Sequence, residues 1–360
     1  MPLRSVKTSV NHARLPAGSC STLRWRQKSP VLGTDRGHNS HDENHADSAW
    51  IDELVHWSGV MAIVTESTLV LPGSIVSSDW LEANLEDPGL RIIDIRGYVK
   101  SKDLGGGFQS AEYTGARDEY DSAHIPGSVY IDWTTDIVNP NDPVSVQIAT
   151  AEQFTEAMNA RGIGSWTRVV VVDHTGGHFA TRMWWALQYY GHDAGAILDG
   201  GFNKWAAENR PLTKTVLFPY PAQFFPKERP ELRVSVEDVA KIVDDGGALL
   251  VDARDEPTYT GEVWRGSRKG HIPTAVNLPA KSFLNPDGTW RPQAEIAEIV
   301  GRAGITPDTN VVAYCNGGVT ATSVLFALHQ IGYQNVANYD GSWNEWGERS
   351  DLPTETGKPE

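Results

Sequence analysis

Three sequence patterns occur twice in this chain, in the same order and at similar intervals. The pairs are RIIDIRG (91–97) with LLVDARD (249–255), AHIPGSVYIDW (123–133) with GHIPTAVNLPA (270–280), and YGHDAGAILDGGFNKW (190–205) with IGYQNVANYDGSWNEW (331–346). Repetition on this scale indicates a duplicated structural unit. The chain is therefore expected to fold as two related domains, for which 360 residues are sufficient.

Short apolar runs alternate with helical patterns in both halves. This alternation predicts an α/β fold of two tandem domains, each a mainly parallel sheet flanked by helices. In the second half, 248–251 and Val311–Tyr314 are expected strands, and 294–303 and 320–331 are expected helices.

Composition marks the boundaries of the domains. The proline-rich run FPYPAQFFPKERP (218–230) is typical of a semi-rigid linker. We place the first domain at 70–215, the linker at 216–230 and the second domain at 231–357.

Residues 1–60 differ from the rest and are expected to be disordered. Residues 1–34 are basic and rich in Ser and Thr, with no acidic residue, which is compatible with an organelle transit peptide. The alternative is an over-extended start, with Met61 as the true first residue. We accordingly expect a cytoplasmic protein, or a mitochondrial one if the leader is genuine.

Charge and composition exclude several classes of protein. The formal net charge of −15 argues against a nucleic-acid partner. No run approaches 18 consecutive apolar residues, so no membrane span is expected. Two cysteines without a CxxC pair predict neither a disulfide framework nor a zinc site, and they favour a reducing compartment. Cys20 lies in the leader and is assigned no role.

The second cysteine lies where an α/β fold binds ligands. Cys315 follows the expected strand Val311–Tyr314, and ligands of such sheets bind at the carboxyl ends of strands. The candidate anion-binding loop comprises Asn316, Gly317, Gly318, Val319 and Thr320. Its two glycines permit the positive φ that lets backbone N–H groups converge, and the following helix adds partial positive charge. Both effects favour a thiolate, or a larger anion on that sulfur. The alternative is an inert, buried cysteine.

A phosphatase is disfavoured by a specific absence. That chemistry places an Arg after Cys and five residues, to clamp phosphate oxygens. Here Thr320 is followed by Ala321.

Together, the D-x-R strand ends, the HIP turns, the Cys-x-x-Gly-Val-Thr loop and the closing YDGSWNEW resemble a tandem rhodanese-type sulfurtransferase of the thiosulfate and 3-mercaptopyruvate family. The resemblance covers residues 75–356. It implies that Cys315 takes sulfane sulfur from a small donor, carries it as a persulfide and passes it to a thiophilic acceptor. It implies no cofactor and no metal. In the first domain His174 stands where the cysteine would be, so that domain is expected to be silent and to help wall the cleft.

The donor is less tightly constrained. By resemblance, thiosulfate enzymes often carry Arg-Lys after the cysteine and mercaptopyruvate enzymes Gly-Ser, whereas this chain has Asn316 and Gly317. YTGE, NPDGTW and YIDWTTD resemble a bacterial thiosulfate branch. We therefore expect transfer from thiosulfate to cyanide or a thiol. The alternatives are a 3-mercaptopyruvate sulfurtransferase and a non-catalytic module that binds a partner or senses oxidants.

Cations for an anionic donor are expected close to the HIP turn of the second domain. Arg265 and Arg268, with Lys269 beside them, form a basic cluster in an acidic chain. The alternative is a solvated loop. Arg254 is expected to pair with Asp252 at a strand end, and it is also a candidate for facing the cleft.

Overall fold

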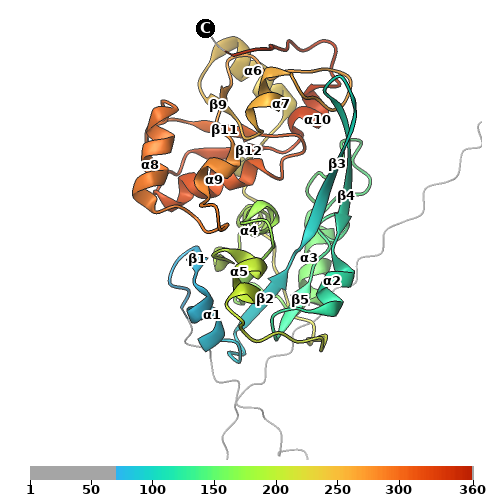
Figure 1. The fold of residues 1–360 in the computed structure, drawn as a ribbon, viewed down its shortest axis with the longest axis vertical. Helices are drawn as coiled ribbons and strands as arrows, with labels where there is room; N and C mark the ends of the chain where they lie inside the picture. Colours follow the sequence, from blue (N-terminus) through green and yellow to red (C-terminus); the bar gives the residue numbers. More distant parts are fainter. Residues whose placement is uncertain (1–69, 359–360) are drawn as a thin grey trace, which may run out of the picture. The chain divides into compact units, whose positions relative to one another are not determined.

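The computed structural model describes residues 70–358, so the predictions for the leader lie outside the described residues. Within this range the chain forms two five-stranded sheets, with every pair of neighbouring strands parallel, and a separate two-stranded hairpin (Figure 1). The predicted α/β architecture of two tandem units is confirmed.

The first sheet has the order β1-β7-β6-β2-β5. Its strands are β1 (Ile75–Val76), β2 (Leu90–Asp94), β5 (Ser128–Tyr130), β6 (Arg168–Val172) and β7 (Gly195–Leu198). Its helices are α1 (Ser78–Ala83), α2 (Arg117–Ser122), α3 (Ala151–Ala160), α4 (His178–Tyr189) and α5 (Gly201–Ala207). The central strand β6 is a buried valine run, as expected for a sheet covered on both faces.

The second sheet has the order β10-β9-β11-β12-β8. Its strands are β8 (Arg233–Val234), β9 (Leu249–Asp252), β10 (Val276–Asn277), β11 (Val311–Tyr314) and β12 (Val336–Tyr339). Its helices are α6 (Val236–Asp245), α7 (Glu256–Thr260), α8 (Gln293–Arg302), α9 (Ala321–Gln330) and α10 (Ser342–Trp346), with short turns η1 (Pro230–Leu232) and η2 (Ala280–Phe283). The four elements predicted here are present, each within one residue of its expected ends.

The antiparallel hairpin of β3 (Gly97–Gly105) and β4 (Phe108–Gly115) was not predicted from the sequence. The hairpin follows the D-x-R end of β2 and extends to the second domain (Figure 1). At its tip, the Gln109 N–H donates to the Trp264 carbonyl at 2.9 Å, and the Trp264 N–H donates to the Gly107 carbonyl at 3.0 Å. The hairpin thus joins the two domains at a point remote from the linker.

The duplicated helices α4 and α9 pack against each other between the domains. Trp184 and Phe326 meet edge to face at 4.9 Å, and the Thr181 hydroxyl lies 2.9 Å from that of Thr322. Each helix is buried along most of its length, because it faces its own sheet and the opposite domain. The loops that precede these two helices are therefore brought close to the domain interface.

A buried ion pair links the domains beside this contact. Arg182 in α4 pairs with Asp340, which follows β12, and both side chains are about 1% exposed. The Arg182 guanidinium also donates to the carbonyls of Val146 at 3.1 Å and Gly318 at 3.3 Å. The other Asp340 oxygen accepts from the Ile148 N–H at 2.9 Å. Asp340 therefore connects the first domain to the cysteine loop.

The buried pair generates a stability prediction. Arg182→Met removes the hydrogen-bonded counter-charge of the buried Asp340 carboxylate and leaves only Arg233, 3.5 Å from its other oxygen, so the free energy of unfolding should fall by about 3 kcal/mol in urea titrations, the lower end of the cost of breaking a buried pair. The control is Arg229→Met, whose ion pair with Asp193 is solvent-accessible and should be worth about 0–1 kcal/mol. Similar losses in the two variants would contradict the assigned role of the buried pair.

Candidate active site

Strand β11 delivers Cys315 to the carboxyl edge of the second sheet, where its side chain is buried. The Cys315 N–H donates to the Ser342 Oγ at 3.1 Å, and its carbonyl accepts from the Trp343 N–H at 3.1 Å. The next carbonyl, of Asn316, accepts from the Asn344 N–H at 2.7 Å. The start of α10 therefore fixes the backbone on which the thiol is carried.

The two glycines of the loop are needed for different reasons. Gly318 has a φ of +72°, so it takes the left-handed conformation that the sequence predicted. Gly317 is absent from the positive-φ residues, which corrects the expectation for that position. Instead, a Cβ on Gly317 would lie 2.5 Å from the Val146 Cγ2 of the first domain. Gly317 is thus required by close approach between the domains.

The loop retains hydrogen-bond donors that the protein does not use. Within residues 70–358, no group accepts a hydrogen bond from the backbone N–H of any residue from Asn316 to Thr320. Gly317, Gly318 and Val319 are buried residues. Since buried N–H groups are nearly always paired, these donors are suited to a bound anion.

The duplicated loop of the first domain contains an anion of its own. The Asp173 carboxylate, directly after β6, accepts hydrogen bonds from four backbone N–H groups: Thr175 at 3.0 Å, Gly177 at 3.0 Å, Phe179 at 2.8 Å and Ala180 at 3.1 Å. The corresponding residue of the second domain is Tyr314, whose hydroxyl accepts from the Ile272 N–H at 3.1 Å. Most N–H groups of the first loop are thus bonded within the loop, whereas those of the second are left open for a ligand.

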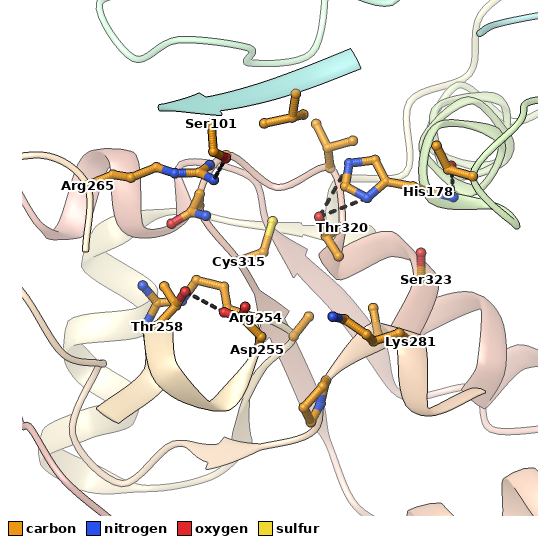
Figure 2. A pocket seen from close by; sticks show the side chains of 18 of the residues that line it. Ser101, His178, Arg254, Asp255, Thr258, Arg265, Lys281, Cys315, Thr320 and Ser323 are labelled. Atoms are coloured by element: carbon orange, nitrogen blue, oxygen red, sulfur yellow. Dashed lines mark hydrogen bonds between the residues drawn. The ribbon is translucent and has the colours of Figure 1, made fainter. Parts of the chain in front are cut away.

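A cavity of about 720 Å³ opens over Cys315 and is lined by both domains (Figure 2). All the predicted loop residues except Gly318 line it, and Gly318 lies behind them, where its carbonyl faces Arg182 and Asn338. The first domain contributes, among others, Val99, Tyr113, Trp133, Val146 and His178. The expectation that the first domain helps to wall the cleft agrees with this placement.

The predicted cations divide into two groups. Arg265 lines the cavity, and its guanidinium donates to the Ser101 Oγ at 2.6 Å (Figure 2). Arg254 also lines the cavity and pairs with Asp252, as expected. Burial opposes the charge of Arg254, but the Asp252 carboxylate outweighs it and raises the pKa, with a smaller contribution from Cys315. Arg254 is therefore a fixed positive charge close to the sulfur.

Arg268 does not belong to the site, which corrects the sequence expectation. It is not part of the cavity lining. Its guanidinium donates to the carbonyls of Gly347 (2.9 Å), Leu352 (2.7 Å), Trp346 (2.6 Å) and Arg349 (2.6 Å). With its donors committed to carbonyls, this side chain fastens the segment after α10 and cannot also hold a donor. Its neighbour Lys269 lies over the Trp264 ring at 5.8 Å.

Lys281 and His178 are two polar residues of the cavity that were not predicted from the sequence. Lys281 in η2 is exposed and lies on a different side of Cys315 from Arg265 in Figure 2, and no ion pair of its ammonium is found among the described residues. His178, the first residue of α4, lies 3.3 Å from the Thr320 hydroxyl through its Nδ1. Burial lowers the pKa of His178 to about 4, against the attraction of Asp173, so the imidazole is neutral at neutral pH.

His174, the residue aligned with Cys315, does not line the cavity. Its ring lies 4.8 Å from that of Tyr98, and burial lowers its pKa, so this imidazole too is neutral. The histidine that lines the cavity is His178, four residues further on.

The described part of the chain contains no cluster of three His, Cys, Asp or Glu side chains that could hold a metal ion. Among the same residues, no helix is long and apolar enough to cross a membrane.

Comparison with known families matches both halves of the chain. The model of the rhodanese-like domain matches residues 77–208 and again residues 235–349. Two parallel α/β units, with a cysteine loop in the second, are the structural counterpart of this double match. The chain belongs to the rhodanese family.

Curated relatives are similar over most of their length. A thiosulfate sulfurtransferase of Corynebacterium glutamicum is 33% identical over 300 residues, covering 80% of this chain and 92% of that protein. The sulfur carrier protein TtuD of Thermus thermophilus is also 33% identical over 300 residues, covering 80% and 98%. The prediction of a sulfurtransferase is thereby confirmed at the level of enzyme class.

Solved structures give the same fold. SseA of Escherichia coli, one of the 3-mercaptopyruvate sulfotransferases, is 30% identical with a TM-score of 0.66, covering 75% of this chain and 98% of that one. The anaerobic ergothioneine biosynthesis enzyme of Chlorobium limicola, in complex with trimethyl histidine, is 25% identical with a TM-score of 0.66, covering 79% and 71%.

The contact between Gly317 and Val146 generates a prediction. Gly317→Ala should slow sulfur transfer to Cys315 in a single turnover by about five- to 150-fold, the equivalent of typical overpacking strain. Val146→Ala in the same chain should restore part of the rate, because it removes the nearer of the two groups that the new Cβ meets and leaves the Asn344 Nδ2, at 2.9 Å, which lies at the end of a flexible side chain that can move. Gly301→Ala in α8, where a Cβ meets nothing within 4 Å, is the control. If the second substitution gives no recovery, the domain contact does not set the loop geometry.

Proposed function

We propose that the protein is a thiosulfate sulfurtransferase that carries sulfane sulfur as a persulfide of Cys315. The observation that carries the proposal is the pair of duplicated loops. The loop after β6 binds its own carboxylate, Asp173, whereas the loop after β11 encloses a thiol and leaves its N–H groups unpaired. A loop built to bind an anion, with a nucleophile at its start, suits an anionic intermediate on that nucleophile.

In the first half-reaction, the Cys315 thiolate attacks the outer sulfur of thiosulfate. A sulfur–sulfur bond forms to Cys315, and the bond within the donor breaks with its electron pair on the departing sulfite. The negative charge that was on the thiolate is then on the persulfide. The N–H groups of residues 316–320 would stabilise this charge, and Arg254 adds a fixed positive charge nearby.

In the second half-reaction, an acceptor removes the outer sulfur. Cyanide attacks through carbon and leaves as thiocyanate, and the bonding electron pair returns to Cys315 as thiolate. A thiolate acceptor reacts in the same way and leaves as a persulfide. Both half-reactions balance without a metal, a redox cofactor or a further reactant.

The charges at the cavity favour thiosulfate as donor. Arg265 and Lys281 line it without an ion pair among the described residues, whereas Arg254 is already paired with Asp252. Among the described lining residues the one carboxylate is that of Asp255, which accepts a hydrogen bond from Thr258. An excess of cations suits a dianion better than a monoanion. The relative from Corynebacterium glutamicum has this activity in its name.

3-Mercaptopyruvate is the second candidate donor, favoured by the similarity to SseA. The two donors are separated by measuring kcat/KM for both on one preparation. A thiosulfate enzyme gives the higher value with thiosulfate, and the reverse order would assign the protein to the mercaptopyruvate branch. We place the reaction in the cytoplasm, because the thiol must stay reduced between turnovers.

Replacement of the nucleophile tests the proposal against a non-catalytic role. Cys315→Ser should abolish sulfite release from thiosulfate while leaving the free energy of unfolding nearly unchanged, since the side chains are close in size. His174→Ala, at the matching position of the first domain, should keep kcat within about tenfold, well short of a lost general acid or base. Turnover by the serine variant would exclude Cys315 as the sulfur carrier.

A further inference from the structure

The hairpin of β3 and β4 is docked on the second domain by several kinds of contact. Besides the two backbone hydrogen bonds at Trp264, Phe108 packs against the Trp264 ring at 5.7 Å. A Cβ on Gly107 would overlap the Glu262 carbonyl oxygen, so the tip lies directly on that backbone. The adjacent Gly106 has open space around the same position.

The docked hairpin forms one wall of the Cys315 cavity. Val99 and Ser101 on β3, with Gln109 and Tyr113 on β4, all line it. The Ser101 hydroxyl accepts the hydrogen bond from Arg265, which lines the same cavity as Cys315 (Figure 2). An arginine on an exposed loop has many rotamers, and this bond selects one of them. The first domain therefore positions the cation of the second.

Access to the sulfur is restricted by the same wall. The Cys315 residue is only 3% exposed, at the base of a cavity of about 720 Å³. Cavities of roughly 300–1,000 Å³ enclose small molecules almost completely. Such a cavity admits an ion or a small thiol, and a folded protein that delivered a cysteine to Cys315 would have to fit beside the hairpin residues that line it.

We propose that the β3–β4 hairpin is the specificity element of this site. It holds Arg265, through Ser101, as the binding residue for the anionic group of a small sulfur donor, and it excludes protein thiols from the Cys315 persulfide. The inference rests on the proposed sulfur transfer. On this inference, a wall supplied by the silent domain makes the site selective for small sulfonate or carboxylate anions.

The test uses two neighbouring glycines of the hairpin tip. Gly106 and Gly107 both have positive φ, +63° and +92°, so alanine strains the backbone at either position. Only Gly107→Ala also drives the tip off the Glu262 carbonyl. Turnover is followed as sulfite release from thiosulfate, with cyanide as the small acceptor or reduced thioredoxin as the bulky one.

Gly107→Ala should lower kcat/KM for thiosulfate about tenfold and raise kcat/KM for reduced thioredoxin, measured at saturating thiosulfate. Gly106→Ala should stay within about twofold of the wild type on both values. Opposite changes with the two substrates are the signature of an opened wall, because simple destabilisation lowers both rates. Equal behaviour of the two variants, or a fall in both rates, would overturn the proposal.

Ser101→Ala tests the positioning of Arg265 without moving the hairpin. The loss of one hydrogen bond should raise KM for thiosulfate about three- to tenfold, with kcat and the thioredoxin rate unchanged. Arg265→Gln should give a larger rise in KM, and adding Ser101→Ala to it should have no further effect. Additive effects of the two substitutions would contradict the coupling.

These outcomes are distinct from failure of the proposed function. A wild-type protein that releases no sulfite from thiosulfate contradicts the sulfurtransferase proposal itself. If the wild-type protein releases sulfite from thiosulfate and the hairpin variants behave like the wild type, only the inference about the hairpin is contradicted.

Discussion

The buried ion pair of Arg182 and Asp340 is the interaction on which the geometry of the candidate site depends. It lies between the two domains, and Arg182 also holds the Gly318 carbonyl. Asn338 donates to the same carbonyl at 3.0 Å, so the Gly318 carbonyl is occupied on the side of the domain interface. The N–H groups of residues 316–320 are thereby left for the cavity. Breaking a buried pair leaves a charge buried without its partner, which is costly. The two domains therefore strongly prefer the arrangement that keeps the pair intact.

Duplication explains how one fold supplies both a scaffold and a reactive site. Each half ends a central strand in a glycine-containing loop that leads into a buried helix, α4 or α9. In the first half the loop binds the Asp173 carboxylate and presents no thiol to the cavity, and in the second the loop presents Cys315. Because α4 and α9 pack against each other, His178, which directly follows the loop of the silent domain, contacts Thr320 of the second domain. The silent domain also supplies the hairpin wall.

Much of the fold was predictable because it depends on local patterns. The repeat predicted two domains, and the apolar run Val311–Tyr314 predicted the strand that carries Cys315. The hairpin was missed because YVKSKDL and FQSAEYT are rich in polar residues, with β3 mostly exposed and β4 mostly half-buried, so they lack the apolar alternation of a buried strand. Its GGG turn was the available signal.

The site was only partly predictable, because side-chain direction is not encoded in spacing. Arg265 and Arg268 are three positions apart, yet one lines the cavity and the other binds four carbonyls. Lys281 gave no signal, since a single lysine after the HIP turn is unremarkable in sequence. His178 and Val146 line the Cys315 cavity only through contact between the domains, which no local pattern specifies.

The central claim is that the Cys315 loop holds sulfur as an anion. Its most direct test is the intact mass of the full chain after incubation with thiosulfate without acceptor, followed by peptide mapping. The account predicts a gain of one sulfur atom on the peptide that contains Cys315, one equivalent of sulfite released, and loss of that sulfur on addition of cyanide. An unchanged mass with no sulfite released, or sulfur found only at Cys20, would contradict it.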